Sequence, residues 1–462
     1  MKKQEAKRWF HGPHPTLRPN PHPNPLDRSR LPVSRDLSAS LHVTAAGERT
    51  GGGAATLYCA FAAAVLAICN SALALEVDPA VPPEINIGGR LVATADHKSE
   101  KTIASGTESD SSLSIADSSL LFGFSKYLFD DRRYGFAVFG LKIPDDDTDL
   151  KDDIYIHEAH VGIGGPNYEL KLGRSRLGNS LIAFPTIRDD DLLDYLYVAN
   201  GSSNAEAEEY QQFGSVLGGS WWMTRSVQFD GGITGRTRTD TGGARLASSD
   251  LNGGYLGVAY SVPEAIKFDR GIRYAGARLD TQHADVPGSG LPKQTLMALI
   301  GAVSLNLNDN PEETWNLDAQ AIFNDGASVA NLSTLAARAR AKSRALAVAL
   351  RYGKRPALQT RWQAALNLAW KDYGDFAGAS AYTIAPTYLY RLGSGIEFVA
   401  QYRYAHNNST LAAAVGRERE QKLQFGLSFA FDNTFNESVG ERGSILNLEH
   451  DTLDIGPRGG GH

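Results

Sequence analysis

Cysteine and methionine are both scarce in this sequence. Its 462 residues contain two cysteines and three methionines. Both cysteines, Cys59 and Cys69, fall within the first 74 residues. If that segment is removed, the rest of the chain has no thiol and no disulfide. This excludes thiol chemistry after residue 74, and the fold there must be held by hydrogen bonds and packing.

Long apolar runs and an excess of positive charge are also lacking. Residues 75–462 contain no run of about 18 apolar residues, and the mean hydropathy is −0.28, which excludes a polytopic helical membrane protein. A net charge of −6 and an isoelectric point of about 6.0 argue against nucleic acid as a partner. With 42% hydrophobic and 21% charged residues, the chain is not wholly disordered. A membrane barrel stays compatible with all of these values, because its apolar and polar residues alternate.

The first 74 residues differ from the rest. Residues 1–53 are basic and rich in Pro, Gly and His, and we interpret them as an N-terminal extension that a start codon placed too far upstream would explain. Residues 54–74 contain an apolar run too short for a membrane helix of about 20 residues. That run is followed by small residues ending at Ala74, which predicts a cleaved signal peptide. An uncleaved anchor and a lipoprotein attached at Cys69 are the alternatives.

The remainder consists of segments of about ten residues with period-two alternation, separated by turn signals. In Leu358–Lys371, every second residue from Leu358 to Trp370 is apolar or Thr, and most of the residues between them are polar. Many apolar faces end in an aromatic residue, as interfacial girdles require. We count sixteen such segments between residues 84 and 431. The connections between them are, with few exceptions, alternately short and long. The sequence therefore predicts an all-β fold, a 16-stranded antiparallel transmembrane β-barrel over residues 75–431, followed by a tail over 432–462.

Three boundaries rest on weaker signals. Residues 336–352 are rich in helix formers, and as a strand they need a bulge near Arg344 to keep one face apolar. The first long loop is expected over His97–Ser112. The last strand is expected to end at Phe431.

The stretch Glu158–Arg174, EAHVGIGGPNYELKLGR, carries a more specific pattern. An acidic residue precedes Ala-His-Val-Gly-Ile, a Gly-rich turn follows, and the next strand ends in Leu-Gly-Arg. This segment resembles the general bacterial (Gram-negative) outer-membrane porin family. It departs from the family pattern at His160, where an aromatic residue is usual, and the chain continues for 31 residues past Phe431.

The resemblance implies a location, an assembly and a function. It implies an outer-membrane trimer through which small hydrophilic solutes and ions diffuse passively. It also implies that the long loop Ser175–Ala207 folds into the barrel and narrows it, although that loop lacks the family's usual Pro-Glu-Phe-Gly-Gly run. Besides solutes and sister subunits, the expected partners are outer-membrane lipid and lipopolysaccharide.

Charged residues at lumen-facing positions are the candidate site. If the loop narrows the pore, its carboxylates favour cations: Asp189, Asp190, Asp191 and Asp194. The alternative is a solvated loop tip. Strand parity places basic residues on the opposing wall: Arg90, Lys171, Arg361, Lys371 and Arg403. An acidic loop that faces a basic wall would create a transverse electric field across the pore. The alternative is that these basic residues only hydrate the lumen, as polar residues do inside any wide barrel.

A second basic cluster supports other functions. Its members are Arg338, Arg340, Lys342 and Arg344. In the lumen they would favour a substrate-selective anion channel of the phosphate type. Outside, they would bridge lipopolysaccharide phosphates. A third hypothesis is a structural or adhesive barrel plugged by the tail.

Enzymatic and metal chemistry find little support. His157-Glu158-Ala159-His160 is one residue short of H-E-x-x-H, and on a strand its two histidines face opposite sides. A barrel lipase or protease needs a lipid-facing Ser and His at matched depth, which strand parity does not offer. We therefore expect no catalytic residue, no metal and no cofactor.

Overall fold

The computed structural model describes residues 83–435 and Leu446, apart from 116–117, 129–132, 144–154, 177–180, 183, 186–212, 237–252, 264–265, 267–268, 285–293, 327–340, 355–360, 375, 377 and 394. The described residues form seventeen strand segments and one short helix. In chain order they are β1 (Glu84–Thr102), β2 (Gly106–Ser114), β3 (Ser119–Tyr127), β4 (Tyr134–Lys142), β5 (Tyr155–Gly165), β6 (Tyr168–Arg176), β7 (Phe213–Trp222), β8 (Val227–Arg236), β9 (Gly253–Ser261), β10 (Gly271–Ala284), β11 (Gln294–Asn306), β12 (Glu313–Asp325), β13 (Ser343–Lys354), β14 (Trp362–Tyr373), β15 (Ala379–Gly393), β16 (Ile396–Asn407), α4 (Ser409–Val415) and β17 (Arg417–Phe435).

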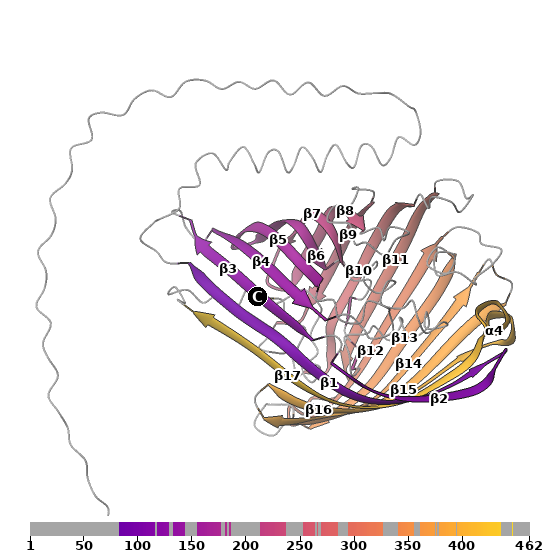
Figure 1. The fold of residues 1–462 in the computed structure, drawn as a ribbon. Helices are drawn as coiled ribbons and strands as arrows, with labels where there is room; N and C mark the ends of the chain where they lie inside the picture. Colours follow the sequence, from indigo (N-terminus) through magenta and orange to yellow (C-terminus); the bar gives the residue numbers. More distant parts are fainter. Residues whose placement is uncertain are drawn as a thin grey trace, which may run out of the picture. The chain divides into compact units, whose positions relative to one another are not determined.

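The strands close into a single antiparallel ring (Figure 1). β2 and β3 pair with successive parts of β1, at Thr94–Thr102 and Glu84–Arg90, and so share one position in the ring. Seventeen segments therefore make the predicted sixteen positions. β17 returns to β1 and pairs with it from Phe435 to Arg417, which leaves no open edge.

The barrel is polar inside and apolar outside. On β14, Gln363, Asn367 and Lys371 point inward and are buried, whereas Leu366, Leu368 and Trp370 point outward and are more than 40% exposed. This is the alternation predicted for Leu358–Lys371. Such an arrangement is costly in water and suits a hydrocarbon surround.

An aromatic row lies on the outer surface near the short-turn end of β12 to β15. Trp315 contacts Tyr352 with ring centroids 4.8 Å apart, Tyr352 contacts Trp362 at 5.4 Å, and Trp362 contacts Tyr388 at 6.2 Å. Amphipathic rings prefer the boundary between hydrocarbon and headgroups. The row therefore matches the expected aromatic girdle. No helix in the described part of the chain has the length and apolar content needed to cross a bilayer.

Three local expectations are corrected. β13 keeps an unbroken register with β12 and β14 from Ser343 to Lys354, so no bulge occurs near Arg344, and that side chain shares the outward face with Leu346. This is possible because Arg344 lies at the strand's end, beside the polar rim. The expected first loop is instead a hairpin, since β1 continues to Thr102 and β2 begins at Gly106. β17 runs past Phe431 to Phe435, because β1 offers partners down to Ile85.

α4 lies at the end of the barrel where the β1–β2 hairpin also lies (Figure 1). Asn408 caps its N-terminus by accepting a hydrogen bond from the Leu411 amide at 3.0 Å. Gly416 ends it in the left-handed conformation, with φ of 79°, a conformation that glycine adopts at little cost. Leu411 and Val415 are buried.

Candidate pore and its lining

Part of the long loop after β6 lies against the inner wall. The Leu181 amide donates to Oε1 of Gln320 on β12 at 2.7 Å. The side-chain amide of Asn367 on β14 donates to the Pro185 carbonyl oxygen at 2.8 Å. Both Gln320 and Asn367 point into the barrel and are buried. Residues 181–182 and 184–185 are therefore held inside the lumen by hydrogen bonds from two different strands.

Small inward residues make room for this segment. The inner face of β13 presents Ala345, Ala347 and Ala349, and β14 and β15 add further alanines. Ile182 and Phe184 are buried in the same cluster. Methyl groups on the wall leave space for the larger side chains of the loop, and the contact removes apolar surface from water. An alanine-rich inner wall thus holds the loop segment.

Oppositely charged side chains face each other around the described wall. Arg351 Nε lies 2.5 Å from Asp318 Oδ2, and the two side chains are 2% and 0% exposed. Arg278 Nε lies 2.6 Å from Asp280 Oδ1, with its guanidinium 4.5 Å from the ring centre of Tyr255. Pairing of this kind lowers the net electric field that the wall produces inside the barrel.

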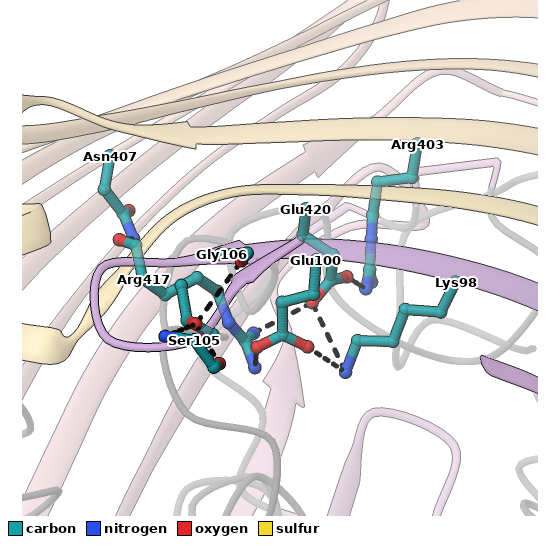
Figure 2. A network of polar contacts seen from close by, with 9 residues as sticks. Lys98, Glu100, Ser105, Gly106, Arg403, Asn407, Arg417 and Glu420 are labelled. Carbon is teal, nitrogen blue, oxygen red and sulfur yellow. Dashed lines mark hydrogen bonds and ion pairs between the residues drawn. The ribbon is translucent and has the colours of Figure 1, made fainter. Parts of the chain in front are cut away.

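A larger ion network lies at the α4 end of the barrel (Figure 2). Glu420 on β17 pairs with Arg403 and with Arg417, whose Nη1 is 2.9 Å from Glu420 Oε2. Lys98 Nζ lies 3.0 Å from Glu100 and 3.6 Å from Glu420, and Arg417 also pairs with Glu100. The network ties β1, β16 and β17 together.

The network lies beyond the apolar band. At its height the outward positions of β1 and β17 are polar, namely Ser99 opposite Gln421 and Lys101 opposite Arg419, and those of β16 are the amphipathic Tyr404 and His406. Burial by itself raises the pKa of Glu420, but Arg403, Lys98 and Arg417 more than offset this and lower it to about 2. Glu420 is therefore a carboxylate at any ordinary pH.

Two glycines of the motif Glu158–Arg174 face aromatic rings on the neighbouring strand. The rings of Tyr134 and Phe136, on β4, lie across Gly164 and Gly162 on β5. A Cβ on Gly164 would lie 2.0 Å from Tyr134 Cζ. Glu158 points inward and is buried, and the His160 ring meets the edge of Phe136 with centroids 6.0 Å apart. This histidine packs on an aromatic ring, and no group that could hold a metal ion occurs among the described residues.

The predicted basic residues occupy different environments. Arg90 on β1, Lys371 on β14 and Arg403 on β16 are buried on the inner wall, and Lys171 on β6 is half-buried there. Arg361 is exposed just before β14, where its Nε donates to the Tyr390 hydroxyl at 3.3 Å. The predicted acidic residues of the loop, Asp189, Asp190, Asp191 and Asp194, lie outside the described residues.

The two described members of the second basic cluster do not line the lumen. Arg344 faces outward and lies 3.6 Å from Asp372, and Lys342, just before β13, lies 3.4 Å from Asp325. Both side chains are more than half exposed at the rim. Of the two placements considered for this cluster, Arg344 has the outer one, because strand parity continues without a bulge. Arg338 and Arg340 lie outside the described residues.

Comparison with known proteins decides the family. The family model for Gram-negative porins matches residues 54–410. The chain belongs to the Gram-negative porin family. Among solved structures, the porin resembles the anion-selective porin from Comamonas acidovorans, with 13% identity, a TM-score of 0.52, and coverage of 76% of this chain and 100% of that one. It also resembles the outer membrane channel DcaP of Acinetobacter baumannii, with 12% identity, a TM-score of 0.51, and coverage of 78% and 100%. None of the curated proteins compared with the chain matches it.

Family and fold together establish an outer-membrane channel rather than an enzyme. They confirm the resemblance that Glu158–Arg174 suggested.

Sequence reasoning missed several residues of this porin's lumen. Gln320 and Asn367 hold the loop, Asp318 pairs with Arg351, and Glu420 joins the ion network. Period-two parity puts Asn367 on the polar face of its strand, and it could have placed Gln320 and Asp318 on the inner wall in the same way. Their partners lie on other strands or in the loop, which a single sequence does not bring together.

Proposed function

We propose that this porin is a water-filled channel for passive diffusion of small hydrophilic solutes and ions, narrowed by its long loop. The fastening of residues 181–182 and 184–185 to Gln320 and Asn367 carries the proposal. A fixed chain segment inside a polar barrel reduces the open cross-section and leaves a wet path beside it. Such a path selects by size and charge and needs no bound cofactor.

We further propose a mild preference for cations. Described wall charges are largely paired, so the wall itself contributes a weak net field. The acidic residues Asp189, Asp190, Asp191 and Asp194 begin four positions after Pro185, which is bonded to the wall. Four carboxylates near a constriction attract cations.

The reversal potential across a planar bilayer in a salt gradient tests this preference. Wild-type protein is expected to favour cations, and changing all four aspartates to asparagine should reduce that preference. The matched control changes Arg338, Arg340, Lys342 and Arg344 to glutamine, and it should change the potential less, because Lys342 and Arg344 lie at the rim. If the wild type instead prefers anions and the control variant loses that preference, the phosphate-type channel replaces this proposal.

Export and assembly complete the proposal. Residues 54–74 would be removed as a signal peptide, so the mature protein would begin at Leu75, which mass spectrometry of protein isolated from outer membranes can check. We propose a homotrimer in contact with lipid and lipopolysaccharide, with Lys342 and Arg344 placed to meet headgroup phosphates. Crosslinking in intact membranes would show trimers if this is correct.

A further inference from the structure

One apolar patch of the inner wall lies on β3 and β4. Leu121 on β3 and Tyr134, Phe136 and Val138 on β4 all point inward, and all are buried. Other inward apolar side chains have their own partners: Ile300 and Ile322 are clustered with the loop residues Ile182 and Phe184, and Leu389 packs on Val399. Apolar side chains of this size on the wall of a wet lumen would expose their surface to water unless something covered them.

The cover comes from the C-terminal tail. Leu446 packs against these residues and is only 6% exposed. It lies in the tail after β17, which the third hypothesis from the sequence placed inside the barrel. A leucine from the end of the chain thus sits on the apolar patch inside the lumen.

The chain can make this connection without strain. Phe435 lies opposite Ile85, Ile85 opposite Phe124, and Phe124 opposite Ala137, so the end of β17 and the patch lie in one row across four strands. Three strand spacings are about 14 Å. Ten residues, 436–445, separate Phe435 from Leu446, and an extended chain of that length reaches about 33 Å.

We propose that the C-terminal tail is an internal ligand of this barrel, docked through Leu446 on the patch of Leu121, Tyr134, Phe136 and Val138, and that it narrows the channel near the short-turn end. The inference rests on the proposed channel function, since narrowing has meaning only for a conducting pore. The occupant of the patch is the tail of the same chain. The patch lies on the β3–β4 wall, whereas residues 181–182 and 184–185 are bonded to the β12 and β14 wall, so tail and loop restrict the lumen from different sides.

Crosslinking tests the docking directly. In the full chain with Cys59→Ser and Cys69→Ser, the pair Leu446→Cys and Val138→Cys should be joined by a short bifunctional thiol reagent, as read by mass spectrometry of the digested protein. The matched control pairs Leu446→Cys with Ala347→Cys, which faces the lumen from β13 across the barrel. Linkage of the first pair alone is expected. Linkage of neither pair, or of both equally, would overturn the docking.

Single-channel conductance tests the narrowing. A chain that ends at Phe435 should conduct roughly 1.5-fold more than the full chain, because an extended segment fills about 5 by 10 Å of cross-section. Equal conductance would refute the narrowing. Absence of conductance from every folded form, with the crosslink still formed, would refute the channel function and leave the docking intact. If the shortened chain does not fold, the Leu446→Asp variant of the full chain takes its place and should also conduct more.

Discussion

The side-chain amide of Asn367 donates a hydrogen bond to the Pro185 carbonyl oxygen, across 2.8 Å and 182 positions of sequence. Its two hydrogens are shared between this oxygen and two further acceptors, the Ala385 carbonyl at 3.0 Å and the Thr387 hydroxyl at 3.1 Å. One buried side chain thus connects the lumenal segment of the loop to two adjacent strands. The loop depends on the wall at this point.

Replacing Asn367 with alanine should loosen the loop. The change leaves the buried Pro185 carbonyl without this donor, which costs about 1–3 kcal/mol of local stability. We expect noisier single-channel currents and faster proteolysis of the loop, with the barrel still folded. Gln363→Ala, on the same inner face of β14, is the matched control and should behave as the wild type. Indistinguishable current noise in the two variants would show that the bond does not hold the loop.

The buried ion pair between Arg351 and Asp318 should be sensitive to loss of one partner. Asp318→Asn leaves the guanidinium buried without its counter-charge, and we expect a loss of about 3–5 kcal/mol in the free energy of unfolding in detergent micelles. Glu313→Gln breaks the exposed pair with Lys354 on the same two strands, where the atoms are 3.7 Å apart, and should cost about 0–1 kcal/mol. Equal losses would mean that water screens both pairs alike.

Gly164 and Gly162 should respond differently to the same rescue. Gly164→Ala drives a Cβ into the Tyr134 ring and should cost about 1–3 kcal/mol, and the Tyr134→Ala background should remove that penalty. Gly162→Ala meets the Leu170 carbonyl oxygen at 2.3 Å as well as Phe136, so Phe136→Ala should leave most of its penalty in place. Double-mutant cycles of thermal unfolding measure both. Equal rescue at the two positions would contradict the backbone contact.

The Glu420 network should give the barrel a defined response to acid. Its folded-state pKa of about 2 lies below the ordinary value of 4.5, so its contribution to stability is complete above pH 4.5 and declines as pH falls toward 2. Unfolding temperature should drop across this window, and Glu420→Gln should flatten the drop while lowering stability at neutral pH. Glu418→Gln is the control two positions away. It alters an exposed pair with Lys101 and should change the profile little. An unchanged slope in Glu420→Gln would assign the acid response to other groups.

Strand parity explains most of what the sequence could predict. Gln363, Asn367 and Lys371 follow one rule along one strand, and the structure places all three on the inner wall. Parity misleads just before β14, where Arg361 lies outside the strand and donates to the Tyr390 hydroxyl. Arg344 keeps the parity of β13, and only the expected bulge would have turned it inward. Strand parity does not predict the position of Leu446, which depends on a contact with β3 and β4, far from it in the sequence. Local periodicity shows whether each face of a strand meets a polar or an apolar environment. It does not show which distant segment of the chain packs against that face.

The pairing of β1 with β17 also sets the order of events during synthesis. Asn86 bonds Thr434 across 348 positions, so nearly the whole barrel must be made before its two edges can meet. Bringing such distant segments together is slow, and long-range strand pairing dominates folding times. A growing or truncated chain that ends before β17 carries two unpaired edges, which hydrocarbon does not tolerate. Insertion must therefore follow completion of the last strand, and shortened products of this gene should accumulate outside the bilayer, where chaperones and proteases reach them.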